Sequence, residues 1–261
     1  VVGIYEAVCE ITLANENEVS DVPEEYKTMI TKSLSGILKH FSAERYRLQS
    51  QGKDVASVKI FASILKNKYD DARERAAFLE DYLKNRAIMK SDDSFYHKML
   101  LEYFTAVYYY EKCFDSYGSE IEDEDTLREL FSHNTDAYWS DVLKLFLIKA
   151  DSEIDGDTTT VLYNTLLSFG ITEYTLFFDA EKNLICHKKE ALTALISDIL
   201  KKSAEGIYPP YGPLFWYVSE FNLYEEVIAS LDALKESDCF TKALALTRDV
   251  CWIFGHFNRI S

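Results

Sequence analysis

The chain has 261 residues, of which 48% are hydrophobic, and a formal net charge of -16. This composition suits one or two folded cores and argues against a disordered chain. Only 9 glycines and 4 prolines are present, too few for the closely spaced turns of a β-sandwich or β-barrel. The negative charge repels phosphate groups, so we expect neither nucleic acids nor anionic membranes as partners.

The cysteines and the lack of membrane and secretory segments indicate the cellular compartment of the protein, and the ends of the chain indicate a fragment. The five cysteines are scattered and form no CxxC pair, which favours free thiols in a reducing compartment over disulfides or a zinc site. No apolar run is long enough to insert into a membrane, and no secretory signal is present. We therefore expect an intracellular protein, cytoplasmic or nuclear. The start at Val1 and the apolar run close to the C-terminus are expected of a fragment of a larger protein.

In the first half of the chain, residues 2–13 fit a helix about as well as a strand. Apolar residues then recur at helical spacing and predict helices over 23–41, 54–65, 70–87 and 93–117. The first follows Pro23, and the caps expected for the others are Asp54, Asp70 or Asp71, and Asp93 or Ser94. Gly118 is expected to end the last of them.

In the second half, acidic loops are predicted at 120–125 and 151–157, because like charges repel and stay solvated. The helices predicted around and after them cover 126–132, 136–150, 157–170, 188–202, 213–221, 223–235 and 239–257. Residues 172–187 have the pattern of a strand, a turn and a strand, and a continued helix is the alternative.

These elements predict an all-α fold of about ten helices. Short connections favour antiparallel neighbours, so we expect an α-solenoid or an elongated bundle. A Pro/Gly-rich break at 206–213 separates a helical region, 1–205, from a C-terminal one, 206–261, and we expect both to form one continuous stack. No repeat of fixed period is visible.

Two acidic clusters resemble metal sites. Asp70, Asp71 and Glu74 form a DDxxE, the pattern with which all-α isoprenoid enzymes hold magnesium, but no partner motif follows. Asp151, Glu153, Asp155 and Gly156 match the first half of an EF-hand loop, whose twelfth position is Leu162 in place of the bidentate glutamate. Helix caps for the first cluster and a solvated helix–helix loop for the second are the preferred explanations.

Motifs for other chemistry are missing from the sequence. It contains no phosphate-binding glycine loop, no HExxH and no GxSxG. We therefore expect no catalytic residue, no bound metal, no cofactor and no small-molecule substrate.

Aromatic side chains are concentrated in two places. Those between Phe95 and Tyr117 ring one predicted helix on nearly every side, which is typical of a central helix. The second group surrounds Pro209, Pro210 and Pro213 and is our candidate partner-binding surface, with a plug at the end of the core as the alternative. We call it the 208–221 cluster; it consists of Tyr208, Tyr211, Phe215, Trp216, Tyr217 and Phe221.

The C-terminal part of the chain resembles the helical stacks of large scaffold proteins, such as the α-solenoid nucleoporins of the nuclear pore. The features that carry the resemblance are the Pro-rich entry, the aromatic run 214–217, and the apolar helices 224–231 and 240–246. The resemblance implies a structural role in an assembly and no catalysis.

Our leading hypothesis is therefore a non-catalytic helical scaffold segment that binds other protein subunits. Two alternatives stay open: an all-α enzyme with magnesium at Asp70, Asp71 and Glu74, and a calcium-responsive helical module at 151–157.

Overall fold

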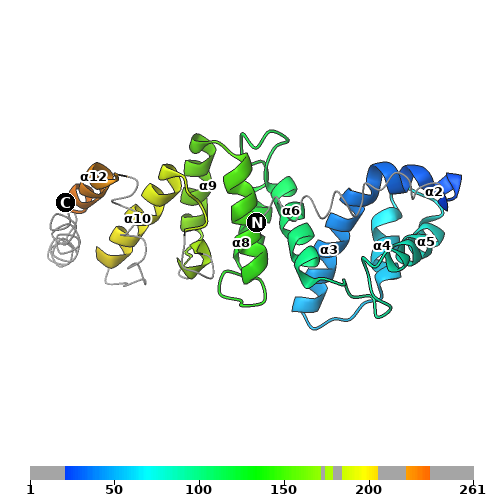
Figure 1. Cartoon of the computed structure of the whole chain (residues 1–261). Coiled ribbons are helices and arrows are strands. Elements are labelled where there is room, and N and C mark those ends of the chain that lie inside the picture. The colour runs from blue at the N-terminus through cyan, green and yellow to red at the C-terminus, as the bar shows by residue number, and fades with distance from the viewer. Residues whose placement is uncertain (1–20, 172–173, 179–183, 205–221, 236–261) are drawn as a thin grey trace. The chain divides into compact units, whose positions relative to one another are not determined.

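The computed structural model describes residues 21–171, 174–178, 184–204 and 222–235 (Figure 1). Helices account for 69% of these residues, and no β-strand is found among them. The all-α prediction is confirmed. None of the described helices has the length and apolar character needed to cross a membrane.

The chain divides into two compact units. Unit 1 comprises Val1–Cys113 and Asp141–Lys149, and unit 2 comprises Phe114–Ser140 and Ala150–Ser261. The boundary predicted at 206 lies outside the described residues, as do the ambiguous segment 2–13 and the helices predicted at 213–221 and 239–257.

Unit 1 begins with one helical stretch made of three parts. These are α2 (Glu24–Thr28), a π-helical segment η2 (Met29–Ser33) and α3 (Leu34–Ser50). Pro23 precedes α2, where its missing N–H costs no hydrogen bond. The apolar spacing that predicts this helix also points its face inward, because Met29, Leu38 and Phe41 are fully buried.

Two shorter helices follow in unit 1, α4 (Ser57–Leu65) and α5 (Ala72–Asn85). The cap predicted at Asp54 is wrong, since α4 begins three residues later and Asp54 instead lies 3.5 Å from Arg45. Asp71 does occupy the residue before α5, but its side chain makes no capping bond.

The helix predicted over 93–117 is shorter at both ends and runs from Lys98 to Cys113 as α6. Phe95 lies before it and bridges to Met89, while Phe114 lies after it and bridges to Ile121. The predicted caps Asp93 and Ser94 therefore belong to a loop. Every residue from Leu100 to Val107 is buried, which confirms that this aromatic helix is central to its unit.

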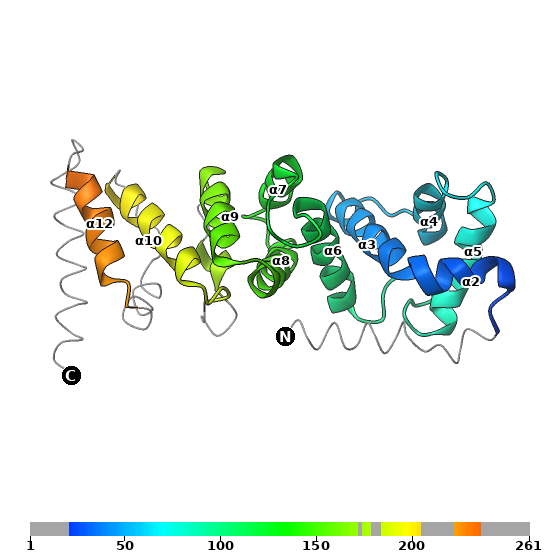
Figure 2. The same ribbon diagram turned by 90° about the horizontal axis from the view of Figure 1, so that it is seen from above.

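Helix packing in unit 1 centres on α3. It packs against α6 and α4, and α4 packs against α5 (Figure 2). Phe41 of α3 and Phe61 of α4 stack with ring centroids 4.1 Å apart, both fully buried. Lys39 of α3 pairs with Glu111 of α6 at 2.5 Å. Aromatic and aliphatic side chains together fill this core.

Unit 2 opens with a tight loop from Phe114 to Ile121, followed by α7 (Glu124–Phe131). Asp123 caps α7 by accepting a bond from the N–H of Thr126 at 2.8 Å. Next come α8 (Ser140–Glu153), whose residues 141–149 belong to unit 1, and α9 (Gly156–Ser168). Trp139, in the segment that follows α7, is fully buried, and its ring stacks on that of His133 with centroids 4.4 Å apart.

The strand–turn–strand expected over 172–187 is wrong, because neither of its two strands is found in the described part of this segment. Tyr174–Phe177 forms a turn of 3-10 helix (η3), and the return of the chain is reduced to one antiparallel bridge between Phe178 and Leu184. Tyr174, Leu176 and Phe177 are all buried. An alternating strand would expose at least one of these three to solvent, so the buried apolar surface favours the helical turn.

Two described helices complete unit 2, α10 (Lys189–Ala204) and α12 (Tyr224–Lys235). Figures 1 and 2 both show α10 between α9 and α12. The helix packing agrees, since α10 packs against α9 and against α12. These three helices are therefore stacked in chain order.

Candidate functional site

The DDxxE cluster lies at the start of α5, where Asp71 is bound to Arg75. The Arg75 Nε donates to the Asp71 carboxylate at 2.6 Å, and this bond lowers the pKa of Asp71. Arg75 also donates to the carbonyl of Glu25 at 2.6 Å, and its guanidinium lies 4.4 Å from the ring centre of Tyr69. Asp71 therefore orients an arginine that ties α5 to α2.

A depression of about 870 Å³ borders the same cluster. Lys59 and Lys66 line it together with Asp70, Asp71 and Glu74. Mixed charges of this kind neutralise one another, which weakens the attraction that a diphosphate-bound magnesium ion would need.

The EF-hand-like cluster is divided between two helices. Asp151 and Glu153 lie in the last turn of α8, so the loop predicted over 151–157 is largely helical. Asp155 caps α9 by accepting the N–H of Thr158 at 2.7 Å, a bond that lowers the pKa of Asp155. Helical geometry turns successive carboxylates to different sides. Among the described residues, no group of three histidine, cysteine or acidic side chains could hold a metal ion.

We expect calorimetric titration with calcium and with magnesium to show no site tighter than about millimolar, the weak end of protein calcium sites. The reason is that Asp71 is engaged by Arg75 and that Asp151 and Asp155 belong to separate helices. Micromolar binding that disappears in Asp151→Ala or Asp70→Ala would contradict this expectation.

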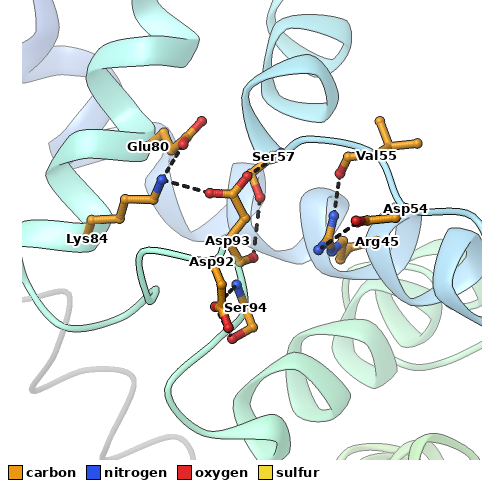
Figure 3. A network of polar contacts seen from close by, with 9 residues as sticks. All are labelled: Arg45, Asp54, Val55, Ser57, Glu80, Lys84, Asp92, Asp93 and Ser94. Carbon is orange, nitrogen blue, oxygen red and sulfur yellow. Dashed lines mark hydrogen bonds and ion pairs between the residues drawn. The ribbon is translucent and has the colours of Figure 1, made fainter.

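A network of polar contacts in unit 1 joins α4, α5 and the loop before α6 (Figure 3). The Lys84 ammonium lies 2.5 Å from Glu80 and 2.7 Å from Asp93. The second oxygen of Asp93 accepts the backbone N–H of Ser57, the first residue of α4, at 3.2 Å. Asp93 thus caps a helix that lies 36 residues earlier in the chain.

The backbone of this loop is held in an uncommon conformation. Asp93 has a φ of 64°, in the left-handed region that few residues other than glycine, asparagine and aspartate adopt. Asp92 stabilises the turn by accepting both the N–H and the hydroxyl of Ser94, at 3.0 and 2.6 Å. The turn presents the Asp93 carboxylate to α4 and Lys84 at the same time.

Electrostatics keep this network charged. Burial by itself would raise the pKa of Asp93, but the bonds from Lys84 and Ser57 outweigh it and lower that pKa. The same contacts, with Asp93 and Glu80, raise the pKa of Lys84. An ammonium with a raised pKa is a poor general base, so the network is suited to holding helices together.

Unit 2 contains a second polar group around Cys186. Its thiol donates to the Asp151 carboxylate at 2.9 Å, and Lys188 donates to the carbonyl of Ile154 at 2.6 Å. Burial, followed by the bond to Asp151, raises the pKa of Cys186 to about 12. Because the thiolate is the nucleophilic form, this cysteine is inert at neutral pH. Burial likewise raises the pKa of the neighbouring Tyr163.

A third polar group connects η3 to α10. The Tyr174 hydroxyl donates to Asp198, and Lys202 lies 2.7 Å from the same carboxylate. Lys202 also donates to the carbonyl of Ile171 at 2.8 Å. Burial and the bond to Asp198 raise the pKa of Tyr174. This group fixes the segment that was predicted to be a strand.

The predicted partner-binding residues lie outside the described part of the chain. Tyr208, Tyr211, Phe215, Trp216, Tyr217 and Phe221 all fall within 205–221. The 208–221 cluster therefore stays a prediction. Of the five cysteines, Cys113 and Cys186 are described; both are buried, and neither forms a disulfide within the described part of the chain.

The interhelical polar groups were missed by reasoning from sequence. Asp93 was expected to cap the helix that follows it, and the residue type was a correct signal for a cap. Its partner could not be predicted, because Ser57 and Asp93 are 36 positions apart and no sequence pattern brings them together.

Comparison with protein-family models, with curated proteins and with solved structures finds no match to this chain.

Proposed function

We propose that this chain is a non-catalytic helical scaffold segment that binds other protein subunits within a larger assembly. The observation that carries the proposal is the stacking of α9, α10 and α12 in chain order. In helical scaffold proteins each helix pair packs on its neighbours in sequence, which leaves long surfaces open for partners.

The polar groups support the same proposal. Three side chains of types that are common in catalytic sites are bonded to other parts of the fold: Lys84 to Asp93, Cys186 to Asp151, and Asp198 to Tyr174. Each pair joins separate elements of one unit. The shifted pKa values of Lys84, Asp93, Cys186 and Tyr174 follow from burial and from these structural contacts, so they do not indicate a catalytic centre.

The aromatic residues near the C-terminus add the prediction that partners bind at the 208–221 cluster. Aromatic residues beside a rigid proline loop are common at the centres of protein interfaces. A loop normally lies on the surface, and six aromatics on a surface loop would expose more apolar area than a monomer usually leaves uncovered.

We expect Trp216→Ala to weaken partner binding by about 2 kcal/mol or more and to leave the melting temperature nearly unchanged. The measurement combines thermal melting of the purified chain with quantitative partner capture, using the wild-type chain as the reference. A large fall in melting temperature with unaltered capture would show that Trp216 belongs to the core, and would refute the partner surface.

A further inference from the structure

Unit 2 contains a groove between the 114–121 loop with α7 on one side and α9 on the other. Its volume is about 400 Å³, enough for a few side chains. Ile121 and Val161 give it apolar surface, and Val161 is 53% exposed although it is a large aliphatic residue. We call this depression the α7–α9 groove.

Charge at the rim of the groove is of one sign. Glu120, Glu124 and Asp157 line it, and the described part of its lining contains no lysine, arginine or histidine. Arg128, which lies outside the groove, is 2.9 Å from Glu124 and neutralises part of its charge. Glu120 and Asp157 are exposed. The groove therefore attracts cationic groups, and the net charge of -16 adds to that attraction.

The walls of the groove are held in place by hydrogen bonds. The Thr158 hydroxyl of α9 donates to the carbonyl of Ser119 at 2.9 Å, which ties the two walls together. The Asp115 carboxylate accepts the hydroxyl of Ser119 at 2.7 Å and the N–H of Glu120 at 3.2 Å. A groove with fixed walls loses little conformational entropy when a ligand binds.

We propose that the α7–α9 groove binds a segment of a partner protein in which lysine or arginine residues flank an apolar side chain. The inference rests on the proposed function, because it names the chemistry of one partner. The apolar side chain covers Val161 and Ile121, and the flanking cations face Glu120 and Asp157. Complementary charge of this kind sets specificity and the rate of association.

The test is a titration of the full chain with a short fluorescent peptide in which leucine alternates with lysine, followed by fluorescence anisotropy at physiological ionic strength. We expect the double variant Glu120→Lys, Asp157→Lys to lose at least about tenfold in affinity for this probe. Val161→Ser should weaken it roughly threefold, because part of the apolar contact is lost.

The matched control is the double variant Asp125→Lys, Glu129→Lys. It makes the same change in net charge at exposed positions of α7, and Asp125 lies in the first turn of its helix as Asp157 does in α9. We expect the control to bind the probe within about twofold of the wild-type chain, since rim charges act mainly at close range under these conditions. A peptide with glutamate in place of lysine should not bind.

Equal weakening by the control and groove variants would show attraction to overall charge alone and would overturn the inference. Unchanged binding by the groove variant would overturn it as well. Thermal melting checks that each variant is folded, and Glu120→Gln with Asp157→Asn repeats the test if the lysine variant unfolds. The outcome is separable from that of Trp216→Ala: failure at the groove leaves the 208–221 cluster standing, and failure at Trp216 leaves the groove standing.

Discussion

Replacement of Trp139 by alanine is expected to lower the free energy of unfolding by about 3–5 kcal/mol. Trp139 is fully buried, and its ring lies 4.4 Å from that of His133 at an interplanar angle of 6°. Removing the indole takes away a large apolar surface and leaves a cavity that the surrounding helices can close only in part. Urea unfolding followed by circular dichroism measures the loss.

The control for this change is Tyr117→Ala in the same unit. Tyr117 is 86% exposed, so its removal should change the free energy of unfolding by less than about 0.5 kcal/mol. Similar losses for the two variants would contradict the burial on which the prediction depends.

Replacement of Asp93 by alanine is expected to cost about 2–3 kcal/mol of unfolding free energy. Loss of the cap on α4 contributes about 1 kcal/mol. Placing alanine in the left-handed conformation contributes about another 1 kcal/mol, since the φ of this residue is 64°. The remainder comes from Lys84, which keeps Glu80 as a partner at 2.5 Å and loses its ion pair with Asp93 at 2.7 Å.

Two further variants separate these contributions. Asp93→Asn keeps an acceptor for the N–H of Ser57 and tolerates the left-handed conformation, so it should lose about 1 kcal/mol. Asp93→Gly relieves the backbone strain but removes the cap and the charge, so its loss should lie between those of the other two. Equal losses in all three variants would mean that the charge on Asp93 accounts for the whole effect.

The contribution of Asp93 also depends on pH in a defined direction. Its pKa in the folded state lies below the value in the unfolded chain, which is about 3.9. The stabilisation is therefore complete above the unfolded value and is lost as pH falls through the folded one. The difference in stability between the wild-type chain and Asp93→Asn should shrink below about pH 4.

The all-α class and the positions of most described helices follow from local sequence patterns. Helical spacing of apolar residues is a local property, and it is enough to identify α3, α9 and α10 because each must bury one face. The same local signals failed at helix ends. Asp54 and Ser94 are residue types that favour caps, but they cap no helix here. The helices α4 and α6 each begin further along the chain than these two residues predict.

Which polar groups meet depends on how the helices pack. Ser57 and Asp93, Asp151 and Cys186, and Tyr174 and Asp198 are each brought together by packing of separate elements. The α7–α9 groove arises in the same way, because Glu120 and Asp157 are 37 positions apart and share a rim only after α9 packs beside the 114–121 loop. Such contacts depend on the burial of apolar faces far from the polar residues themselves, and no local pattern in the sequence encodes them.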